Sequence, residues 1–295
     1  MPQNFIVIGT SALLITFRCN LRCKLCCTDT PYMPKEKQVD FPLEKMKDVL
    51  KRYFEVIKHI RKLSFGGGEP TLYSNLPELI EYTAGFRNQF EVFEIITNGA
   101  VMPSGAILDM AEKHKDIIFF MIDNYGENIS RRVREISAVF ESRGISFKIR
   151  DYHGPEAHAG GWVNLGDYSL KHDAVKAKNM LKDCCISSKK KDNTGVNKGS
   201  NGEALEQAEG VFFINYAANT NGLIHRCARA YSTLGAGAVA ETPDIFVNIM
   251  DEKKTVAQIR EEIITLFSSD YYPACEYCNG FDDSSVRYEP AEQIH

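Results

Sequence analysis

The stretch Leu13-Leu-Ile-Thr-Phe-Arg-Cys19-Asn-Leu-Arg-Cys23-Lys-Leu-Cys26 joins a short apolar run to three closely spaced cysteines. The apolar part, residues 13–17, predicts a buried strand, and the cysteines follow it in a C-x3-C-x2-C pattern. A structural zinc site takes four tetrahedral ligands, usually as two close pairs. Three close cysteines with no histidine nearby leave one position open, as an iron–sulfur cluster with one iron free for an exogenous ligand requires. The pattern therefore favours such a cluster over zinc.

Strand-like runs alternate with helical patterns through the first half of the chain. Helical patterns lie at residues 40–61, after Asn75 and Pro77, through 107–110, and from 129 to 140 with Gly144 as a C-cap. This alternation indicates parallel strands joined by right-handed crossovers. The sequence predicts an α/β fold, a partial (β/α)6 TIM-like barrel, with residues 162–165 as the candidate sixth strand. The first five strands are expected at residues 13–17, 62–65, 94–97, 117–123 and 146–150.

The second half of the chain has a different character. Residues 187–210 are polar and rich in Lys, Asn, Gly and Ser, which predicts a solvated insertion. Residues 211–216 and 223–226 flank a turn and predict a β-hairpin. Thr255 and Gln258 form a capping box at the start of a last helix. We expect a core domain over residues 1–182 and a small α+β auxiliary cluster domain over residues 183–295.

Composition limits the classes of partner. The net charge of −4 over 295 residues shows no excess of basic residues that would attract a polyanion, so no nucleic-acid partner is expected. The longest apolar runs are strand-sized, so no membrane span is expected. The first nine residues have no basic region, which argues against a signal peptide and predicts a cytoplasmic location. Nine cysteines in a reducing compartment then indicate a metal site or catalysis.

Polar or ligand-type residues follow each predicted strand. The cysteines follow the first, and Gly66-Gly67-Gly68-Glu69-Pro70 follows the second. Asn98 and Gly99 follow the third. Asp123 with Asn124 follows the fourth, and Arg150 with Asp151 follows the fifth. Ligands bind at the carboxyl ends of parallel strands, so these clusters are expected to converge on one rim.

Over residues 10–165 the sequence resembles the radical S-adenosyl-L-methionine (SAM) superfamily. Its C-x3-C-x2-C motif is matched by Cys19, Cys23 and Cys26, and its GGEP motif by residues 67–70; Leu25 stands where the family usually has an aromatic residue. The resemblance implies a 4Fe-4S cluster on the three thiolates, with the amino and carboxylate groups of SAM on the open iron.

The same resemblance implies residues that hold SAM. Gly67 and Gly68 would let the backbone approach the cofactor closely. Glu69 would accept a hydrogen bond from the SAM amino group. Asn98 and Asp123 are candidates for contacts with the ribose or the methionyl portion; their alternative role is to cap the loops in which they lie.

The C-terminal cysteines resemble the truncated "twitch" form of the SPASM extension that some radical SAM enzymes carry. This implies a second, auxiliary 4Fe-4S cluster. Its ligands would be Cys227, Cys275, Cys278 and Cys185, with Cys184 as the alternative to Cys185. A four-cysteine zinc knot is the alternative interpretation of this region.

The resemblance implies an enzyme in which a 5′-deoxyadenosyl radical abstracts a substrate hydrogen atom. The expected reaction is dehydrogenation or epimerisation of a sugar- or cyclitol-type small molecule, with radical modification of a ribosomally made peptide as the alternative. A reducing donor such as flavodoxin or ferredoxin would supply the electron. The competing class is a non-catalytic zinc-binding protein. The catalytic residue is left open among Cys27, Asp123, Arg150, Asp151 and Tyr152. Residues 152–158 and 160–162, which include Trp162, are candidates to line the substrate pocket, and a loop with satisfied polar side chains is the alternative.

Overall fold

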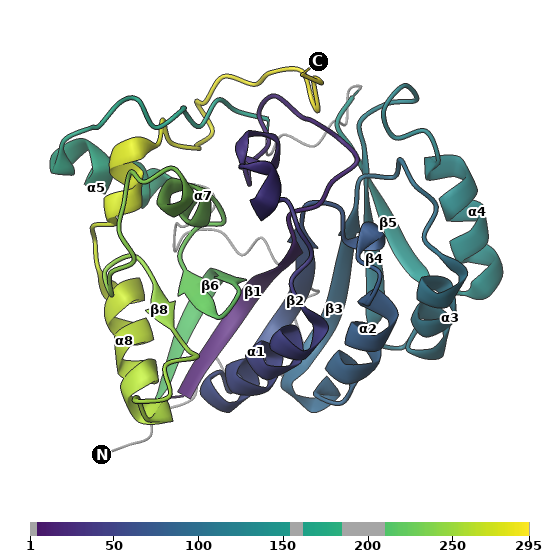
Figure 1. Ribbon diagram of the computed structural model, residues 1–295, viewed down its shortest axis with the longest axis horizontal. Coiled ribbons are helices and arrows are strands. Elements are labelled where there is room, and N and C mark those ends of the chain that lie inside the picture. The colour runs from purple at the N-terminus through teal and green to yellow at the C-terminus, as the bar shows by residue number, and fades with distance from the viewer. Residues whose placement is uncertain (1–4, 154–161, 185–209, 295) are drawn as a thin grey trace.

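A computed structural model describes residues 5–153, 162–184 and 210–294 of the chain. One eight-stranded sheet runs through it in the order β5-β4-β3-β2-β1-β6-β7-β8. Figure 1 shows the curved sheet and the long loop that follows β1 above the ends of the strands. The strands are β1 (Phe5–Thr16), β2 (His59–Gly67), β3 (Phe90–Thr97), β4 (Ile118–Asn124), β5 (Ser146–Asp151), β6 (Val211–Thr220), β7 (Leu223–His225) and β8 (Val247–Asn248).

Strands β1 to β6 are mutually parallel, and β7 and β8 extend the sheet in antiparallel pairing. A helix follows each of the strands β2 to β4 before the next parallel strand begins, as the crossover rule requires. The helices are α1 (Leu43–Val56), α2 (Leu76–Ala84), α3 (Gly105–Lys113), α4 (Val133–Arg143), α5 (Ala174–Asp183), α7 (Arg229–Gly235) and α8 (Val256–Ser268). The carboxyl ends of β1 to β6 therefore face one rim.

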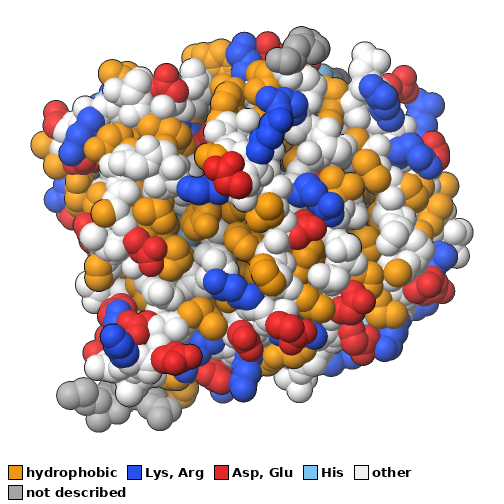
Figure 2. All heavy atoms as spheres, viewed as in Figure 1, with side chains coloured by type: hydrophobic (Ala, Val, Ile, Leu, Met, Phe, Trp, Pro, Cys, Tyr) orange, Lys and Arg blue, Asp and Glu red, His pale blue; other side chains and the backbone are white. Residues whose placement is uncertain are grey.

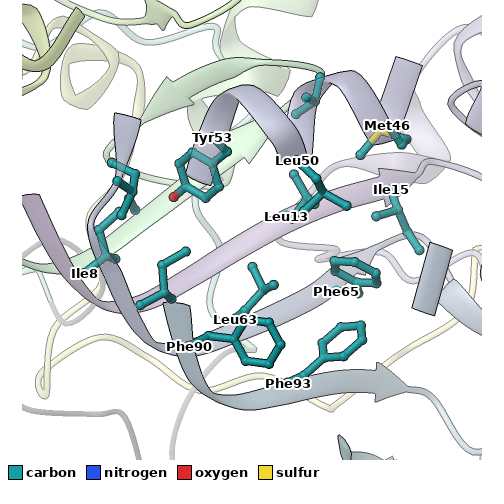
Figure 3. Close-up of a cluster of buried hydrophobic side chains, with 14 of the residues drawn as sticks. Ile8, Leu13, Ile15, Met46, Leu50, Tyr53, Leu63, Phe65, Phe90 and Phe93 are labelled. Carbon is teal, nitrogen blue, oxygen red and sulfur yellow. The ribbon is translucent and has the colours of Figure 1, made fainter. Parts of the chain in front are cut away.

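The main core lies between α1 and the strands β1 to β3. Figure 3 shows α1 side chains at helical spacing meeting alternate side chains of β1 and β2. Tyr53 is fully buried there, and its hydroxyl lies 2.8 Å from the Ser11 Oγ, which satisfies both polar atoms. The apolar members drawn include Ile8, Leu13, Ile15, Met46, Leu50, Leu63, Phe65, Phe90 and Phe93. This packing fixes the end of β1, from which the cysteine loop leaves.

The structure confirms the α/β fold with a mostly parallel sheet, and it confirms two helix ends. Gly144 ends α4 in the left-handed region with a φ of 65°. The Thr255 side chain accepts from the Gln258 backbone while the Gln258 side chain accepts from Thr255, completing the capping box of α8. The predicted hairpin is β6–β7.

Two element predictions were wrong. Residues 162–165 form no strand, although Val163 and Leu165 are buried. Their backbone accepts isolated hydrogen bonds from C-terminal residues: Tyr288 N donates to Trp162 O, and Asn279 N donates to Leu165 O. The sixth parallel strand is instead β6, paired with β1. The first helix ends at Val56, because the chain turns there and residues 59–61 already belong to β2.

β6 joins the sheet of the first 150 residues, so the segment expected as a separate auxiliary unit shares hydrogen bonds with β1. The division at residue 182 stays a prediction. The predicted insertion at 187–210 lies almost wholly outside the described residues. No helix among the described residues is long and apolar enough to cross a membrane. On the face in Figure 2, acidic and basic side chains are interspersed.

Candidate radical SAM site

The GGEP segment is fixed to the end of β1 by steric fit and hydrogen bonds. A Cβ at Gly67, whose φ is +119°, would lie 2.1 Å from the Thr16 carbonyl oxygen, and one at Gly68 would lie 2.2 Å from the Arg18 oxygen. Gly68 N donates to Thr16 O at 2.7 Å, and Glu69 N donates to Arg18 O at 2.9 Å. These glycines are therefore required by the protein's own backbone, and the contact orients the chain as it enters the cysteine loop.

The cysteine loop is a series of tight turns. Cys26 N donates to Cys23 O at 3.2 Å, and Asp29 N donates to Cys26 O at 3.0 Å. The C-terminal segment closes over the loop, because Lys24 N donates to Glu292 O at 2.7 Å and Cys23 forms a β-bridge with Gln293. In Figure 1 the C-terminal end of the chain runs across the top of the molecule toward this loop.

Each of the three cysteine sulfurs has a polar neighbour. Leu21 N donates to the Cys19 Sγ at 3.4 Å. The Gln293 Nε2 donates to the Cys23 Sγ at 3.4 Å. The Cys26 Sγ lies 3.2 Å from the Thr28 hydroxyl. N–H groups aimed at sulfur, as at Cys19 and Cys23, stabilise thiolates bound to iron–sulfur clusters. At Cys26 either atom can be the donor, and the Thr28 hydroxyl also donates to the Gly67 carbonyl oxygen at 3.3 Å.

Burial keeps two of these thiols protonated when they have no cation. Desolvation raises the pKa of Cys19 to about 12, with Glu69 and the other two cysteines adding repulsion. Burial likewise raises the pKa of Cys23 to about 11. A buried thiol loses its proton when a cation compensates the thiolate charge, so these residues suit a tightly bound metal centre.

Glu69 is buried and held from two sides. Its Oε1 accepts from the Thr71 Oγ1 at 2.6 Å, and its Oε2 accepts from the Asn98 backbone N at 2.8 Å. Burial raises its pKa above the ordinary value of 4.5, and these hydrogen bonds oppose that shift. The Thr71 backbone N also donates to the Oε1 at 3.2 Å, which uses both lone pairs of that oxygen, so a further donor would bind at the Oε2. Asn98 connects the end of β3 to the loop, because its Nδ2 donates to the Asn20 Oδ1 at 2.9 Å.

Asp123 and Arg150 form an ion pair between β4 and β5. The Arg150 Nε and Nη2 donate to the two Asp123 oxygens at 2.6 and 2.9 Å. Burial alone would lower the pKa of Arg150, but the Asp123 carboxylate outweighs it and raises the pKa above its ordinary value. The Tyr125 hydroxyl donates to the Asp123 Oδ2 at 3.0 Å, so the pair is held by a third group.

One cavity of about 280 Å³ gathers these groups at the carboxyl ends of the strands. Aromatic rings line one part of it: Tyr125 lies 4.9 Å from Tyr152 and 5.3 Å from Trp162, between ring centroids. The Arg150 guanidinium lies 5.7 Å from the centre of the Tyr152 ring. The cavity is also lined by Cys19, Cys23, Cys26, Cys27, Gly67, Gly68, Glu69, Asn98, Asp123 and Tyr216.

Cys27 and Asp151, both candidates from the sequence, lie differently. The Cys27 side chain lines the cavity, and desolvation and the neighbouring Cys26 raise the pKa of its thiol. Asp151 is exposed, does not line the cavity, and accepts a hydrogen bond from the Asn124 side chain.

A second group of cysteines lines a small cavity of about 30 Å³ that residues of α7 also border. Cys184, Cys227, Cys275 and Cys278 all line it, whereas Cys185 is outside the described residues. Burial raises the pKa of Cys275 to about 12, and the nearby Cys278 and Cys184 add repulsion. Among the described residues no three His, Cys, Asp or Glu side chains are grouped closely enough to hold a single metal ion.

Three residues that belong to these sites were missed by reasoning from the sequence. Gln293 lies 270 positions from Cys23, a separation at which spacing carries no signal. Tyr125 and Tyr216 follow or lie on predicted strands, and their place near the strand ends was the available signal.

Comparison with known proteins agrees with this geometry. Residues 13–143 match the model of the radical SAM superfamily. Over 113 residues the chain is 29% identical to the tungsten-containing aldehyde ferredoxin oxidoreductase cofactor-modifying protein of Pyrococcus furiosus, a stretch that spans 38% of this chain and 30% of that relative.

Two solved structures resemble nearly the whole chain. BtrN in complex with AdoMet (SAM) and 2-DOIA is 14% identical, with a TM-score of 0.51, and the match covers 98% of this chain and 99% of that one. AnSMEcpe with bound AdoMet is 13% identical, with a TM-score of 0.51, over 96% of this chain and 93% of that one. At this level of identity the likeness concerns the fold. The residues that match the radical SAM superfamily model, 13–143, include the three-cysteine loop and the GGEP segment.

Proposed function

We propose that this chain is a radical SAM enzyme that oxidises a C–H bond of a hydroxylated small molecule of the sugar or cyclitol class. The observation that carries the proposal is a single cavity lined by the three motif cysteines, Glu69, Asn98 and an aromatic wall. We use that name for the rings of Tyr125, Tyr152 and Trp162. When bound in this cavity, a reduced 4Fe-4S cluster together with SAM would supply a 5′-deoxyadenosyl radical. The substrate radical would complete the two-electron oxidation by passing one electron to the auxiliary cluster proposed below and one proton to water.

The chain's own residues would bind and orient SAM. Cys19, Cys23 and Cys26 would hold the cluster, and their polar neighbours would stabilise the thiolates. The Glu69 carboxylate, fixed by Thr71 and the Asn98 backbone, presents an acceptor that suits an ammonium group.

The substrate would lie against the aromatic wall beside the Asp123–Arg150 pair. Tyr125 and Trp162 meet edge to face, and aromatic rings in this part of the cavity would pack against the C–H groups of a cyclic polyol. Enclosure by these rings keeps the reacting carbon oriented and excludes water.

We also propose an auxiliary 4Fe-4S cluster on Cys184, Cys227, Cys275 and Cys278. The support is that these four thiols line one buried cavity and affect one another's pKa values. Iron analysis of Cys184→Ala and Cys185→Ala tests this: the first should lose about four irons per chain, and the second should keep about eight, given two four-iron centres. The reverse result would make Cys185 the ligand.

A second candidate reaction, epimerisation, is favoured by Cys27. Its thiol lines the cavity and would donate a hydrogen atom to a substrate radical; one electron from the reducing donor and one proton from water would return the resulting thiyl radical to the thiol. Oxidation gives a product two mass units lighter, whereas epimerisation leaves the mass unchanged and introduces deuterium from D2O. Cys27→Ala should leave oxidation intact but stop deuterium incorporation.

The test begins with anaerobic purification and metal analysis. A brown protein with about eight irons supports the proposal; a colourless protein with zinc overturns it. Incubation with SAM, reduced flavodoxin or ferredoxin and a panel of cyclitols, sugars and peptides should give 5′-deoxyadenosine together with a lighter cyclitol or sugar. If only the peptides are converted, the substrate is a peptide and the proposed small-molecule class is wrong.

A further inference from the structure

Arg229 is a buried arginine that lies between the two cysteine groups. It is the first residue of α7, two positions after Cys227, and its exposed fraction is only 4%. An arginine is always charged, so burying one this deeply requires specific partners.

One side of the guanidinium binds the loop that follows the motif cysteines. The Arg229 Nη1 donates to the Asp29 Oδ2 at 2.8 Å, and the Nη2 donates to the Gly166 carbonyl oxygen. The guanidinium also lies 4.3 Å from the centre of the Tyr168 ring, whose hydroxyl donates to Asp29. Asp29 N in turn donates to Cys26 O, so Arg229 is two contacts from a motif cysteine.

The other side of Arg229 borders the second cysteine group. Arg229 lines the 30 Å³ cavity together with Cys227 and Cys278. Burial raises the pKa of Cys278, and the Gly280 backbone N–H and the Arg229 charge oppose that shift. Among the described residues, the buried Nε–H of Arg229 has no acceptor.

An unpaired buried N–H beside four thiols fits an iron–sulfur cluster. An orphaned donor costs free energy unless an acceptor arrives, and cluster sulfides and cysteine sulfurs accept such hydrogen bonds. Donors to sulfur and nearby positive charge raise the reduction potential of a cluster, because they stabilise its more negative reduced form.

We propose that Arg229 is a positioning residue that donates its Nε–H to a sulfur of the auxiliary cluster and raises its reduction potential, while the Asp29 carboxylate partly offsets that charge. The inference rests on the auxiliary cluster of the proposed function. It makes the Asp29–Arg229 pair a direct link between the loop of the SAM cluster and the auxiliary centre.

The test is an EPR-monitored redox titration of the auxiliary cluster alone. The full-length chain carrying Cys19→Ala, Cys23→Ala and Cys26→Ala is reconstituted anaerobically and serves as the parent. Arg229→Met in this parent should shift the midpoint to a more negative potential, and Asp29→Asn should shift it to a more positive one. Arg229→Lys, which keeps the charge but removes the Nε–H, should fall between Arg229→Met and the parent.

The matched control is Arg143→Met on α4, since Arg143 pairs with Asp109 and Glu112 at the surface. It should leave the midpoint unchanged. A purely structural role for Arg229 would lower iron content without shifts of opposite sign for the Arg229 and Asp29 variants.

A missing auxiliary cluster and a wrong role for Arg229 would give different results. A parent that binds no iron removes the auxiliary cluster and this inference with it. A parent with about four irons whose midpoint equals that of Arg229→Met overturns the Arg229 role alone. If Arg229→Met loses its iron, Asp29→Asn decides: a midpoint that is unchanged or more negative overturns the inference.

Discussion

The close approach of Gly68 to the end of β1 predicts a large effect of Gly68→Ala. The new Cβ would lie 2.2 Å from the Arg18 carbonyl oxygen. An ordinary C···O contact is about 3.3 Å, so one backbone must move by about 1 Å. That movement breaks the bonds from Gly68 N to Thr16 O and from Glu69 N to Arg18 O.

The magnitude follows from these contacts. Two backbone hydrogen bonds at about 1 kcal/mol each, with overpacking of about 1–3 kcal/mol, give a loss of about 3–5 kcal/mol in the free energy of unfolding. Urea unfolding of the metal-free protein measures it. The displaced loop should also bind less iron, by up to about four atoms per chain.

Gly105→Ala at the start of α3 is the matched control, because a Cβ added there would have nothing within 4 Å. It should change stability by less than about 1 kcal/mol and leave iron content unchanged. The steric account would be refuted if Gly68→Ala and Gly105→Ala had the same unfolding midpoint and the same iron content.

Three further predictions concern Glu69, Gln293 and Arg150. Because burial raises the pKa of Glu69 and the carboxylate is the form that attracts an ammonium group, SAM affinity should fall as the pH falls through that raised pKa. Glu69→Gln should remove this dependence and weaken binding about 10–100-fold in equilibrium dialysis, with an unaltered pH profile counting against the role. Gln293→Leu, which removes the N–H donor to Cys23, should keep the iron but give the SAM cluster a more negative midpoint in EPR titration; an unchanged midpoint would dismiss that contact. Arg150→Met should cost about 2–3 kcal/mol in urea unfolding by leaving Asp123 unpaired, less than for a fully buried pair because the Arg150 side chain keeps 27% exposure. Restoring stability with Asp123→Asn in the same chain would confirm that cause, and no recovery would exclude it.

The strand positions could be predicted because apolar runs bounded by turn residues coincide with buried strands in a parallel sheet. Residues 94–97 and 117–123 fall within or beside β3 and β4 for that reason. Residues 162–165 have the same apolar character but pack against C-terminal residues without pairing in the sheet. Local pattern cannot distinguish the two cases, because sheet pairing depends on a distant partner.

The site was predictable where residues lie together in sequence and not where the fold brings them together. The motif cysteines and Glu69 are local motifs at the ends of β1 and β2. The contact of Gln293 with Cys23 spans 270 positions and depends on the path of the C-terminal segment. The choice between Cys184 and Cys185 depends on one peptide unit at the end of α5, which residue type does not determine.

The central claim is that Cys19, Cys23 and Cys26 hold the iron centre at which SAM is cleaved. Formation of 5′-deoxyadenosine from SAM under dithionite tests it most directly, with reconstituted wild-type chain and the three-cysteine alanine variant assayed side by side. We expect the nucleoside from the wild-type chain and none above background from the variant, which should still contain about four irons in its auxiliary centre. Equal nucleoside yields from the two proteins would contradict the assignment.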